Sequence, residues 1–421
     1  MYEEYVLDNG LRVITEHIPH VRSVSVGLWI GAGSMHEKPQ ENGLSHFLEH
    51  MLFKGTQRRS ARAIAEEMDA IGGQINAFTS KECTCYYAKV MDAHLPIAMD
   101  VLCDLLLYAT LDETELNKER GVILEEIAMV EDTPEDLVHD LLSETILAGN
   151  PLAQPILGPA DQIRSYTRKA LADYRDAHYR PDNTVLAIAG NYAPDTLRAL
   201  VEKHLGAWKS VSHGAAMESD PCFTPGVARR QKDIEQVHIC LGYPGISMGS
   251  PDLYALSVFN NLFGGGMSSR LFQRIREESG LAYSVYSYPT VYPGCGIFTL
   301  YAGTSLAHLP SVLEQLQQEV ARILADGVEE EEFRKAREQL KGGYILSLEG
   351  SSSRMSNIGR SKLLLDHVRD EEEVLAKIDA VTKADVERIA SEILTKPYGV
   401  SLVGRDVDNF STDLLKTAVK A

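Results

Sequence analysis

Residues 43–56 read GLSHFLEHMLFKGT, and within them His46, Glu49 and His50 form the pattern H-x-x-E-H. If residues 44–53 are helical, His46 and His50 are four residues apart and lie one above the other on the same face. Two imidazoles at that spacing can both bind one zinc ion. Glu49 lies beside them, where its carboxylate could take a proton from a zinc-bound water. The stretch therefore predicts a helix that carries a metal site and its own base.

The same stretch has a plainer interpretation, which is an amphipathic helix whose apolar residues pack while its two histidines are ordinary surface or core-edge residues. Leu and Phe residues lie on both sides of the polar trio, however, so the helix is expected to be largely buried. Burying two imidazoles and a carboxylate is costly unless they are paired or bind a metal. H-x-x-E-H is also a signature of metallopeptidases, which favours the zinc interpretation.

A third zinc ligand must come from elsewhere in the chain, and the acidic segment 112–135 has a helical pattern. Such a run usually forms a solvated, charged helix face. Here, though, Glu119 and Glu126 fall on a stripe with Val122, Ile123, Ile127 and Val130, at spacings of three and four, whereas Glu125 points away. Glu126 is the preferred third ligand, with Glu119 as a supporting partner or extra base. The periodicity by itself does not rank the two.

Several long segments resemble the inverzincins, the pitrilysin-type metallopeptidases that include insulin-degrading enzyme and the mitochondrial processing peptidase. The closest resemblance is to bacterial homologues of the processing peptidase β subunit. The matching segments are GLSHFLEHMLFKGT (43–56), GGQINAFTSKECTCYYAKV (72–90), ERGVILEEI (119–127), YRPDNTVLAIAGN (179–191) and GGGMSSRLFQRIREESGLAYSV (264–285).

The resemblance implies a role for each residue of the motif. His46, His50 and Glu126 would bind one Zn²⁺ per chain, and Glu49 would be the catalytic base. The family places its ligand glutamate in a V-I-L-x-E context, which decides between the two acidic residues in favour of Glu126. Glu119 remains expected near the catalytic centre.

The two halves of the chain resemble each other, since Val24–Ser34 aligns with Val237–Ser247, and residues 50–55 align with 260–265. One duplicated unit of about two hundred residues, with strands mixed among long helices, is the economical interpretation. We expect an α+β fold of two homologous domains, each with a mixed, mostly antiparallel sheet packed with helices. The expected boundaries are a zinc-binding catalytic domain at 1–210, a linker at 211–230 and a homologous domain at 231–421.

The second copy cannot hold zinc, because Leu256, Phe259 and Asn260 stand where the first has His46, Glu49 and His50. Its Arg276 and Tyr283 would by themselves be a charged helix tip and a packed tyrosine. The resemblance implies instead that they contact the substrate carbonyl or the tetrahedral oxyanion, which a fixed cation and a phenol donor can stabilise.

The length of the chain bears on its assembly. Double-length members of the family hold the zinc domain and the Arg/Tyr domain in opposite halves, and this chain supplies one half. We therefore expect a homodimer that encloses a chamber, in which Arg276 and Tyr283 of one protomer complete the zinc site of the other. A contribution within the same chain is the alternative.

The segment Asn76–Tyr87 (NAFTSKECTCYY) alternates and is rich in residues that favour strands, so it is predicted to be a strand. It could be an ordinary sheet strand. The resemblance implies an exposed edge that binds peptide by β-augmentation, through Asn76, Ala77, Phe78 and Thr79. Recognition through the main chain would give broad specificity.

Composition narrows the class of partner. The formal net charge of −19 argues against nucleic acid or an anionic membrane as a partner. The most apolar stretch, residues 95–111, carries Asp100 and Asp104, so it predicts a core helix instead of a membrane span. The six cysteines show no C-x-x-C pair, and the N-terminus has no apolar signal region, so reduced thiols and a cytoplasmic location are expected.

The sequence thus predicts a zinc metalloendopeptidase that hydrolyses peptides or unfolded protein segments. Two other classes remain open: a non-catalytic, structural subunit of a larger complex, and a regulatory peptide-binding protein that holds zinc. The family contains structural members, but those lose metal ligands that this chain keeps.

Overall fold

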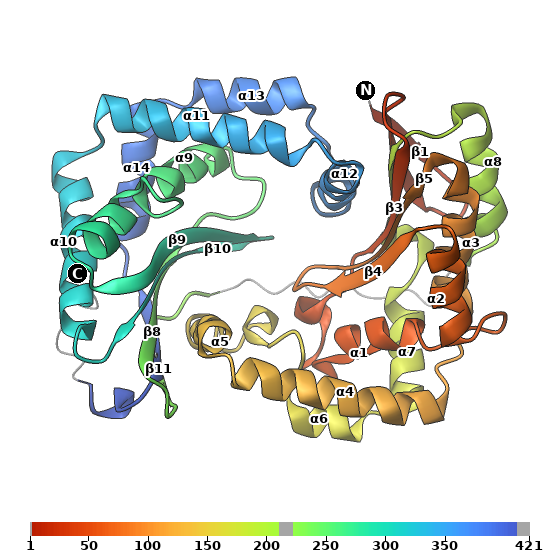
Figure 1. Cartoon of the computed structure of the whole chain (residues 1–421), viewed down its shortest axis with the longest axis horizontal. Helices are drawn as coiled ribbons and strands as arrows, with labels where there is room; N and C mark the ends of the chain where they lie inside the picture. Colours follow the sequence, from red (N-terminus) through yellow and green to blue (C-terminus); the bar gives the residue numbers. More distant parts are fainter. Residues whose placement is uncertain (1, 210–221, 411–421) are drawn as a thin grey trace. The chain divides into compact units, whose positions relative to one another are not determined.

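The structure is a computed structural model that describes residues 2–209 and 222–410 (Figure 1). These residues form two compact units, each assembled from segments that are far apart in sequence. The first unit contains residues 2–128, 154–209 and 347–370, and the second contains residues 129–153, 222–346 and 371–410.

A six-stranded sheet forms the centre of the first unit. All neighbouring strands are antiparallel except β2 and β6, which are parallel. The two central strands, β3 and β6, are almost entirely apolar and buried, as expected for strands covered on both faces. In sheet order the strands are β1 (Tyr2–Val6), β2 (Arg12–His17), β6 (Thr184–Gly190), β3 (Ser23–Ile30), β5 (Thr84–Met91) and β4 (Gln74–Thr79).

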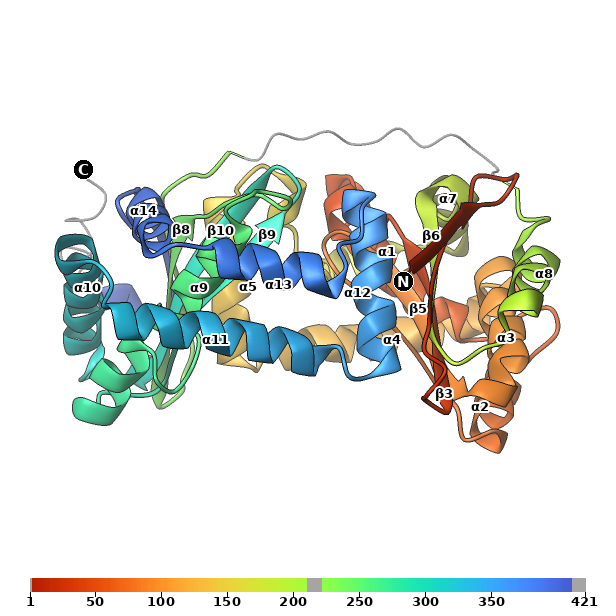
Figure 2. The same cartoon turned by 90° about the horizontal axis from the view of Figure 1, so that it is seen from above.

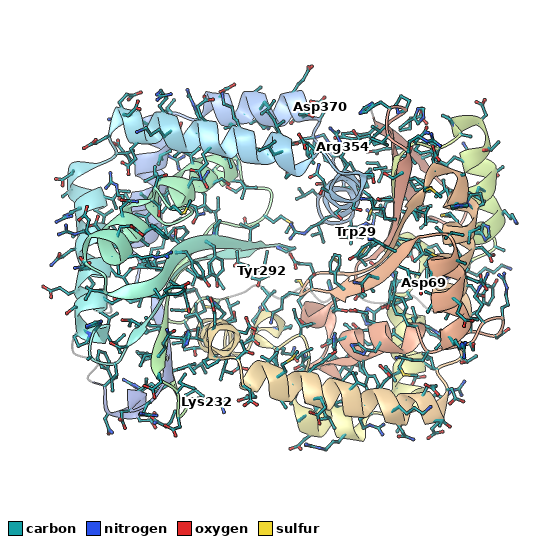
Figure 3. All side chains as sticks on the ribbon, viewed as in Figure 1. Trp29, Asp69, Lys232, Tyr292, Arg354 and Asp370 are labelled. Carbon is teal, nitrogen blue, oxygen red and sulfur yellow. The ribbon has the colours of Figure 1, made fainter. Side chains whose placement is uncertain are left out.

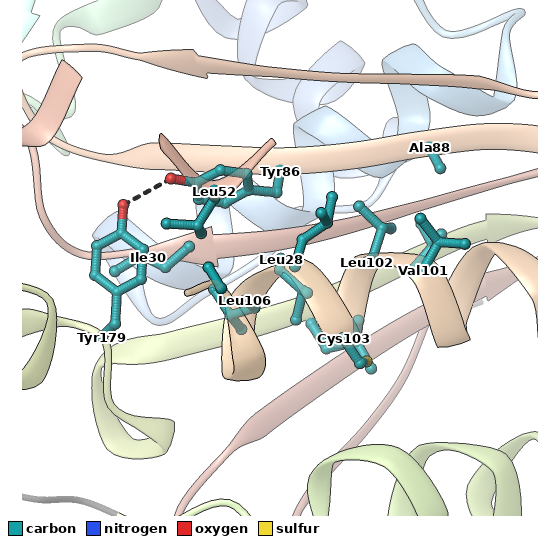
Figure 4. Packing of buried hydrophobic residues seen from close by; sticks show 14 of the residues in the cluster. Leu28, Ile30, Leu52, Tyr86, Ala88, Val101, Leu102, Cys103, Leu106 and Tyr179 are labelled. Atoms are coloured by element: carbon teal, nitrogen blue, oxygen red, sulfur yellow. Dashed lines mark hydrogen bonds between the residues drawn. The ribbon is translucent and has the colours of Figure 1, made fainter. Parts of the chain in front are cut away.

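One face of this sheet packs against the main core of the unit, part of which is drawn in Figure 4. Leu28 and Ile30 of β3 belong to this core together with residues of α3, and the hydroxyls of Tyr86 and Tyr179 are hydrogen-bonded at 2.9 Å. The helices of the unit besides α12 are α1 (Leu44–Leu52), α2 (Ala61–Ala70), α3 (Leu95–Tyr108), α4 (Glu113–Glu131, whose last turn belongs to the second unit), α6 (Ala160–Ser165), α7 (Arg168–His178) and α8 (Pro194–Leu205).

Helix α3 is the predicted core helix, and its two aspartates are paired. Asp104 is buried and accepts hydrogen bonds from Thr56 (2.7 Å) and Arg59 (2.9 Å). Asp100 accepts from Arg58 at 2.7 Å. Pairing with cations and a hydroxyl offsets the cost of placing carboxylates beside the core. No helix in the described part of the chain is long and apolar enough to cross a membrane.

The other face of the first sheet is covered by α12 (Ser351–Leu365), a helix from the C-terminal half of the chain (Figure 2). Met355 and Ile358 pack there against Trp29 and neighbouring strand residues. Figure 3 labels Trp29 on β3 and Arg354 on α12. Arg354 donates to Glu16 of β2 at 2.6 Å, which adds an ion pair to the apolar contact.

A five-stranded sheet forms the centre of the second unit. Its parallel pair is β7 and β11, and the other neighbours are antiparallel. In sheet order the strands are β7 (Val227–Gln231), β11 (Gly399–Gly404), β8 (Gln236–Pro244), β10 (Cys295–Ser305) and β9 (Ala282–Tyr292). The helices of this unit besides α5 are α9 (Leu253–Phe263), α10 (Leu309–Asp326), α11 (Glu330–Ser347), α13 (Glu371–Ala380) and α14 (Lys383–Leu394).

Helix α5 (Pro134–Ile146), from the N-terminal half, packs against strands β8 and β11 of this second sheet. Ser401 of β11 donates to the carbonyl of Val138 at 2.7 Å, and Cys240 of β8 lies 3.2 Å from the imidazole of His139. The two halves of the chain therefore exchange helices, α5 in one direction and α12 in the other. The expected domains were the contiguous ranges 1–210 and 231–421. The units in the structure differ from them because α5 belongs to the second unit and α12 to the first.

The strand orders reveal the duplication directly. The series β2–β6–β3–β5–β4 and β7–β11–β8–β10–β9 each begin with one parallel pair and continue antiparallel. The expected α+β class with two related domains is confirmed. Of the expected linker, residues 211–221 lie outside the described residues, and residues from Val227 onward already belong to β7.

The prediction of one strand over Asn76–Tyr87 is wrong. The segment is a hairpin, with β4 ending at Thr79 and β5 beginning at Thr84. The hydroxyl of Ser80 accepts hydrogen bonds from the amides of Glu82 and Cys83, which closes a tight turn that strand propensity does not reveal.

Candidate metal centre

Helix α1 carries the H-x-x-E-H residues, and a buried carboxylate holds its first turn. The side chain of Glu37 accepts hydrogen bonds from the amides of Gly43 (2.8 Å) and Ser45 (2.7 Å) and from the side chain of Asn42 (2.9 Å). An anion is stabilised at a helix N-terminus, where backbone amides point outward. Burial raises the pKa of Glu37, and these donors oppose that shift. Sequence reasoning missed this residue.

Gly43 precedes the helix with φ +97°. A side chain at this position would also meet the carbonyl of Leu157 at 2.7 Å. The chain therefore needs glycine to enter α1 along this path.

His46 and His50 of α1 and Glu126 of α4 converge on one point. The Nε2 atoms of the two imidazoles lie 3.6 Å and 3.5 Å from Oε2 of Glu126. One ligand atom of each residue lies within 4.8 Å of the others, and in the described part of the chain this is the one group of three such donors able to hold a metal ion.

The spacing of these donors fits zinc. A tetrahedral zinc with ligands about 2.0–2.2 Å away places its donor atoms about 3.3–3.6 Å apart. The observed separations fall at that value and exceed an ordinary hydrogen bond. Burial, with a smaller effect from His50, lowers the pKa of His46 to about 3, so its imidazole is neutral near pH 7. Neutral imidazole is the form that binds metal.

Glu119 contacts His50 and is not itself one of the three converging donors. His50 donates from Nδ1 to Oε2 of Glu119 at 3.1 Å, and Oε1 of Glu119 pairs with Lys54 at 2.8 Å. A carboxylate on Nδ1 fixes the tautomer in which Nε2 carries the free lone pair. The structure thus brings Glu119 to a supporting position. His46 has no equivalent, because its Nδ1 atom is buried without a hydrogen-bond partner in the described residues.

The helical stripe expected on α4 is only partly right. Ile123 is buried and Glu125 is exposed, as predicted, but Val122 is 43% exposed. The inward face of α4 contains Glu119, Ile123 and Glu126. It is narrower than the stripe predicted from the spacing of the sequence.

Glu49 lies on α1 beside the three donors. Its Oε2 atom accepts a hydrogen bond of 2.5 Å from the hydroxyl of Thr79. Burial raises the pKa of Glu49, while Thr79 and His50 oppose the shift. A carboxylate whose pKa is moved toward neutrality is better suited to accept and return a proton.

A pocket of about 410 Å³ opens beside Glu49 and His50. Its wall is half polar and half apolar by residue, with Lys54, Asn76 and Glu119 as the other polar members. The apolar lining residues are Phe53, Ala61, Ile64, Ala65 and Ile75.

The residues predicted to bind substrate all lie on β4, at the end of the sheet order. Asn76 and Phe78 are exposed, and Ala77 and Thr79 are partly buried, so the two pairs face opposite sides of the strand. The Oδ1 atom of Asn76 accepts from the amide of Ala77 at 2.8 Å, and Phe78 packs edge-on against Trp29. Thr79 alone of the four reaches the carboxylate of Glu49.

Arg276 and Tyr283 belong to the second unit, where they contact each other. Arg276 lies in a π-helical turn (Phe272–Glu278), 4.7 Å from the ring centroid of Phe272 and 5.1 Å from that of Tyr283. Tyr283 is 74% exposed. Both line a pocket of about 530 Å³ together with Gly264, Gly265 and Gly266. π-helical turns often mark functional sites.

The positions that correspond to the zinc motif in the second copy serve packing. Leu256 and Phe259 of α9 are buried in the core of the second unit, and Asn260 accepts a hydrogen bond from Ser287 at 2.8 Å.

Comparison with known proteins agrees with this organisation. Sequence models of two domains match the chain: "Insulinase (Peptidase family M16)" over residues 12–160 and "Peptidase M16 inactive domain" over residues 165–340. An uncharacterized zinc protease of Bacillus subtilis is 45% identical over 403 residues, which cover 96% of this chain and 98% of that protein. The chain belongs to peptidase family M16. This membership confirms the resemblance to insulinase-type and pitrilysin-like peptidases.

A further relative and two solved structures match nearly the whole chain. An uncharacterized zinc protease of Streptomyces coelicolor is 41% identical, covering 94% of this chain and 88% of that one. A protease from Helicobacter pylori has the same fold, with a TM-score of 0.88 at 21% identity over 96% of this chain and 99% of that one. A peptidase M16 inactive domain from Pseudomonas fluorescens gives a TM-score of 0.90 at 20% identity, covering 97% and 98%.

Proposed function

We propose that this M16 protein is a zinc-dependent endopeptidase that hydrolyses peptides or unfolded protein segments. The observation that carries the proposal is the convergence of His46, His50 and Glu126, with the carboxylate of Glu49 beside them. The relatives named zinc proteases support a zinc peptidase.

Each residue of the site has a distinct role in the proposed reaction. Zinc, when bound by His46, His50 and Glu126, supplies a Lewis acid that polarises a carbonyl and lowers the pKa of a water. Glu49 accepts a proton from the attacking water and returns it to the leaving amine nitrogen. Glu119 keeps Nε2 of His50 directed at Glu126.

We propose that the substrate lies as an added strand along β4. This strand ends the sheet order, so its outer backbone groups can pair with an extended peptide. Backbone pairing is indifferent to most side chains, which predicts broad sequence tolerance. The apolar part of the pocket wall beside Glu49 would favour an apolar side chain next to the cleaved bond.

Arg276 and Tyr283 are proposed to stabilise the oxyanion, as a paired cation and phenol can. Their contact with each other and their shared pocket support a joint role. In this proposal a homodimer encloses the substrate, and these residues act on the zinc site of the partner protomer. Sedimentation at micromolar concentration tests the dimer, and a fully active monomer would contradict it. A cytoplasmic location stays a prediction.

The decisive test of the function compares wild type with Glu49→Gln on an unstructured peptide. The zinc content of both proteins should be one ion per chain, because Glu49 is outside the donor set. Wild type should cleave the peptide and the variant should keep only a small residual rate, since glutamine cannot take the proton. Equal cleavage by both proteins would refute the assignment.

Peptide binding, measured beside cleavage and zinc content, separates the competing classes. A structural subunit predicts neither cleavage nor peptide binding, and a regulatory zinc protein predicts peptide binding without turnover by the wild type.

A further inference from the structure

We propose that Thr79 is a positioning residue that holds the carboxylate of Glu49 and ties its orientation to strand β4. This inference rests on the proposed function and adds to it a role for a hydroxyl that was expected only to line the substrate strand.

In the hydrogen bond between Thr79 and Glu49, the threonine is the donor and the carboxylate is the acceptor. Thr79 has one hydroxyl proton, and it is donated to Oε2 of Glu49 at 2.5 Å. Charge-assisted hydrogen bonds from a hydroxyl to a carboxylate are short and strong. The bond engages one carboxylate oxygen and leaves the other to take the proton of a water.

A fixed side chain of the neighbouring strand lies beside the hydroxyl of Thr79. Thr79 pairs in register with Thr84, and their hydroxyl oxygens lie 3.4 Å apart. Thr84 is fully buried and donates to the carbonyl of Ala32 at 2.9 Å. Thr84 is therefore a fixed neighbour, and the last residue of β4 has little freedom to shift.

The turn after β4 is anchored on two further sides. The amides of Ser34 and Met35 donate to the carbonyls of Ser80 (3.2 Å) and Lys81 (2.9 Å). On the other side, Arg360 of α12 donates to the buried carboxylate of Glu82 at 2.8 Å. The position of Thr79 is thus set by the rigid end of the hairpin.

This arrangement links substrate to base. A peptide that adds to β4 takes its register from the backbone of residues 76–79, and the final residue of that same run holds Glu49. Any change in the strand that moves the peptide also moves the hydroxyl that orients the base. Glutamate has three side-chain torsions, so an unheld carboxylate would sample several positions.

Two substitutions separate the role of the hydroxyl from that of the methyl group. Thr79→Val keeps the shape and removes the donor, whereas Thr79→Ser keeps the donor and removes a methyl. In the full-length, zinc-loaded protein, Thr79→Val should lower kcat by about 10- to 100-fold, the usual loss when the support of a catalytic group is removed. KM and the zinc content should match wild type. Thr79→Ser should restore kcat to within about threefold of wild type, because the hydroxyl is what positions the base.

A double-mutant comparison tests whether Thr79 acts through Glu49. In a Glu49→Gln background, Thr79→Val should cause no further loss, because the group that it positions has already been replaced. Equal losses in the Val and Ser variants, a rise in KM at constant kcat, or additive losses in the Gln background would each overturn the proposal.

A readout independent of turnover separates this proposal from the proposed function. In crystal structures of the metal-free variants, Glu49 should keep its wild-type rotamer in Thr79→Ser and leave it in Thr79→Val. If wild type proves inactive, the peptidase assignment fails, and these structures still decide whether Thr79 places Glu49. An unchanged Glu49 in Thr79→Val refutes the positioning role.

Discussion

The carboxylates of Glu119 and Glu126 come from the same helix but differ in what they contact. Glu126 lies 3.5 and 3.6 Å from the two Nε2 atoms, whereas Glu119 contacts the opposite ring nitrogen of His50 and the ammonium of Lys54. The first arrangement suits a direct ligand and the second suits a residue that orients a ligand. Replacing each should therefore have different consequences for metal binding.

We predict that Glu126→Gln abolishes stoichiometric zinc binding at micromolar metal, because one of three protein donors loses its charge. Glu119→Gln should retain one zinc per chain with an affinity weakened by about 10- to 100-fold. Competition with a chromophoric chelator measures both. Glu125→Gln is the matched control, because Glu125 is exposed on the same helix and should bind zinc as wild type does. Equal affinities for the Glu119 and Glu126 variants would contradict the distinction.

The sequence pattern predicted how residues of the same helix lie relative to one another. It did not predict contacts between residues of different helices or strands. The spacing of His46 and His50 fixes their common face, and the spacing of Glu119 and Glu126 places both on the inward side of α4. Nothing in the local pattern indicates that Glu37 holds the start of α1 or that Thr79 reaches Glu49. Those contacts join residues of different elements, and only the packing of the elements brings them together.

At the scale of elements, the interface between α12 and the first sheet depends on two glycines that permit close approach. A methyl group on Gly359 of α12 would lie 2.3 Å from Nε1 of Trp29, and one on Gly27 of β3 would lie 2.4 Å from the sulfur of Met355. Both neighbours are buried, so neither has room to move. The helix therefore rests on the sheet at a distance that only glycine permits.

We predict that Gly359→Ala destabilises the protein by about 1–3 kcal/mol, the usual cost of overpacking a core. The sign of this change in unfolding free energy tests the packing, because alanine normally stabilises a helix relative to glycine by up to about 1 kcal/mol. Gly343→Ala in α11 is the control, since its new methyl group meets nothing within 4 Å. Urea unfolding of both variants gives the comparison. A stabilised Gly359→Ala protein would show that the helix can shift outward at no cost.

Helices α1, α3 and α4 followed from the sequence pattern, whereas the partners of the helices did not. Residues 351–365 are mostly polar, and nothing in them indicates that Met355 and Ile358 of α12 cover the first sheet. The hairpin at Ser80 was missed because strand-forming residues lie on both sides of its short turn, which a backbone hydrogen bond from Ser80 to Cys83 and the hydroxyl of Ser80 close.

At the scale of the whole molecule, the exchange of α5 and α12 makes each sheet depend on the other half of the chain. Without α12, one face of the first sheet would lose its cover over Trp29, Cys85 and Ala187, all of which are now almost inaccessible. The duplication was visible in the sequence, whereas the exchange of helices was not. Two homologous halves have the same sequence pattern whether each helix packs on the sheet of its own half or on the sheet of the other half.

We predict that a fragment of residues 1–209 does not reach the native fold, because its sheet lacks α12 and its own α5 lacks a sheet. Joining residues 347–370 to its end through a flexible linker should restore native packing. Emission from Trp29 and near-ultraviolet circular dichroism report the difference, with Trp208→Phe in both fragments to isolate the signal. A fragment of residues 1–209 that unfolds cooperatively and shields Trp29 would show that the exchanged helix is dispensable.

Acid should destabilise both units, in part through one partly buried histidine in each. Burial lowers the pKa of His178 in the first unit and of His139 in the second to about 4. In the unfolded chain each imidazole titrates near its ordinary pKa of about 6.5. Between these values the unfolded state binds more protons, so stability falls as the pH falls from about 6.5 to about 4 and is unaffected by these groups above that window.

The expected outcome is that His139→Gln and His178→Gln each flatten the pH dependence of the unfolding free energy across this window, by the uptake of up to about one proton. The measurement is urea unfolding at several pH values between 4.5 and 7.5 in the presence of chelator, so that metal release does not contribute. His20→Gln, at an exposed position, is the control and should keep the wild-type slope. His139 is also held by the hydroxyl of Tyr288 at 2.7 Å and lies beside Cys240, so its substitution should lower stability at every pH as well. The slope is therefore the informative quantity, and a wild-type slope in both variants would mean that the two imidazoles accept protons as readily in the folded protein as in the unfolded chain.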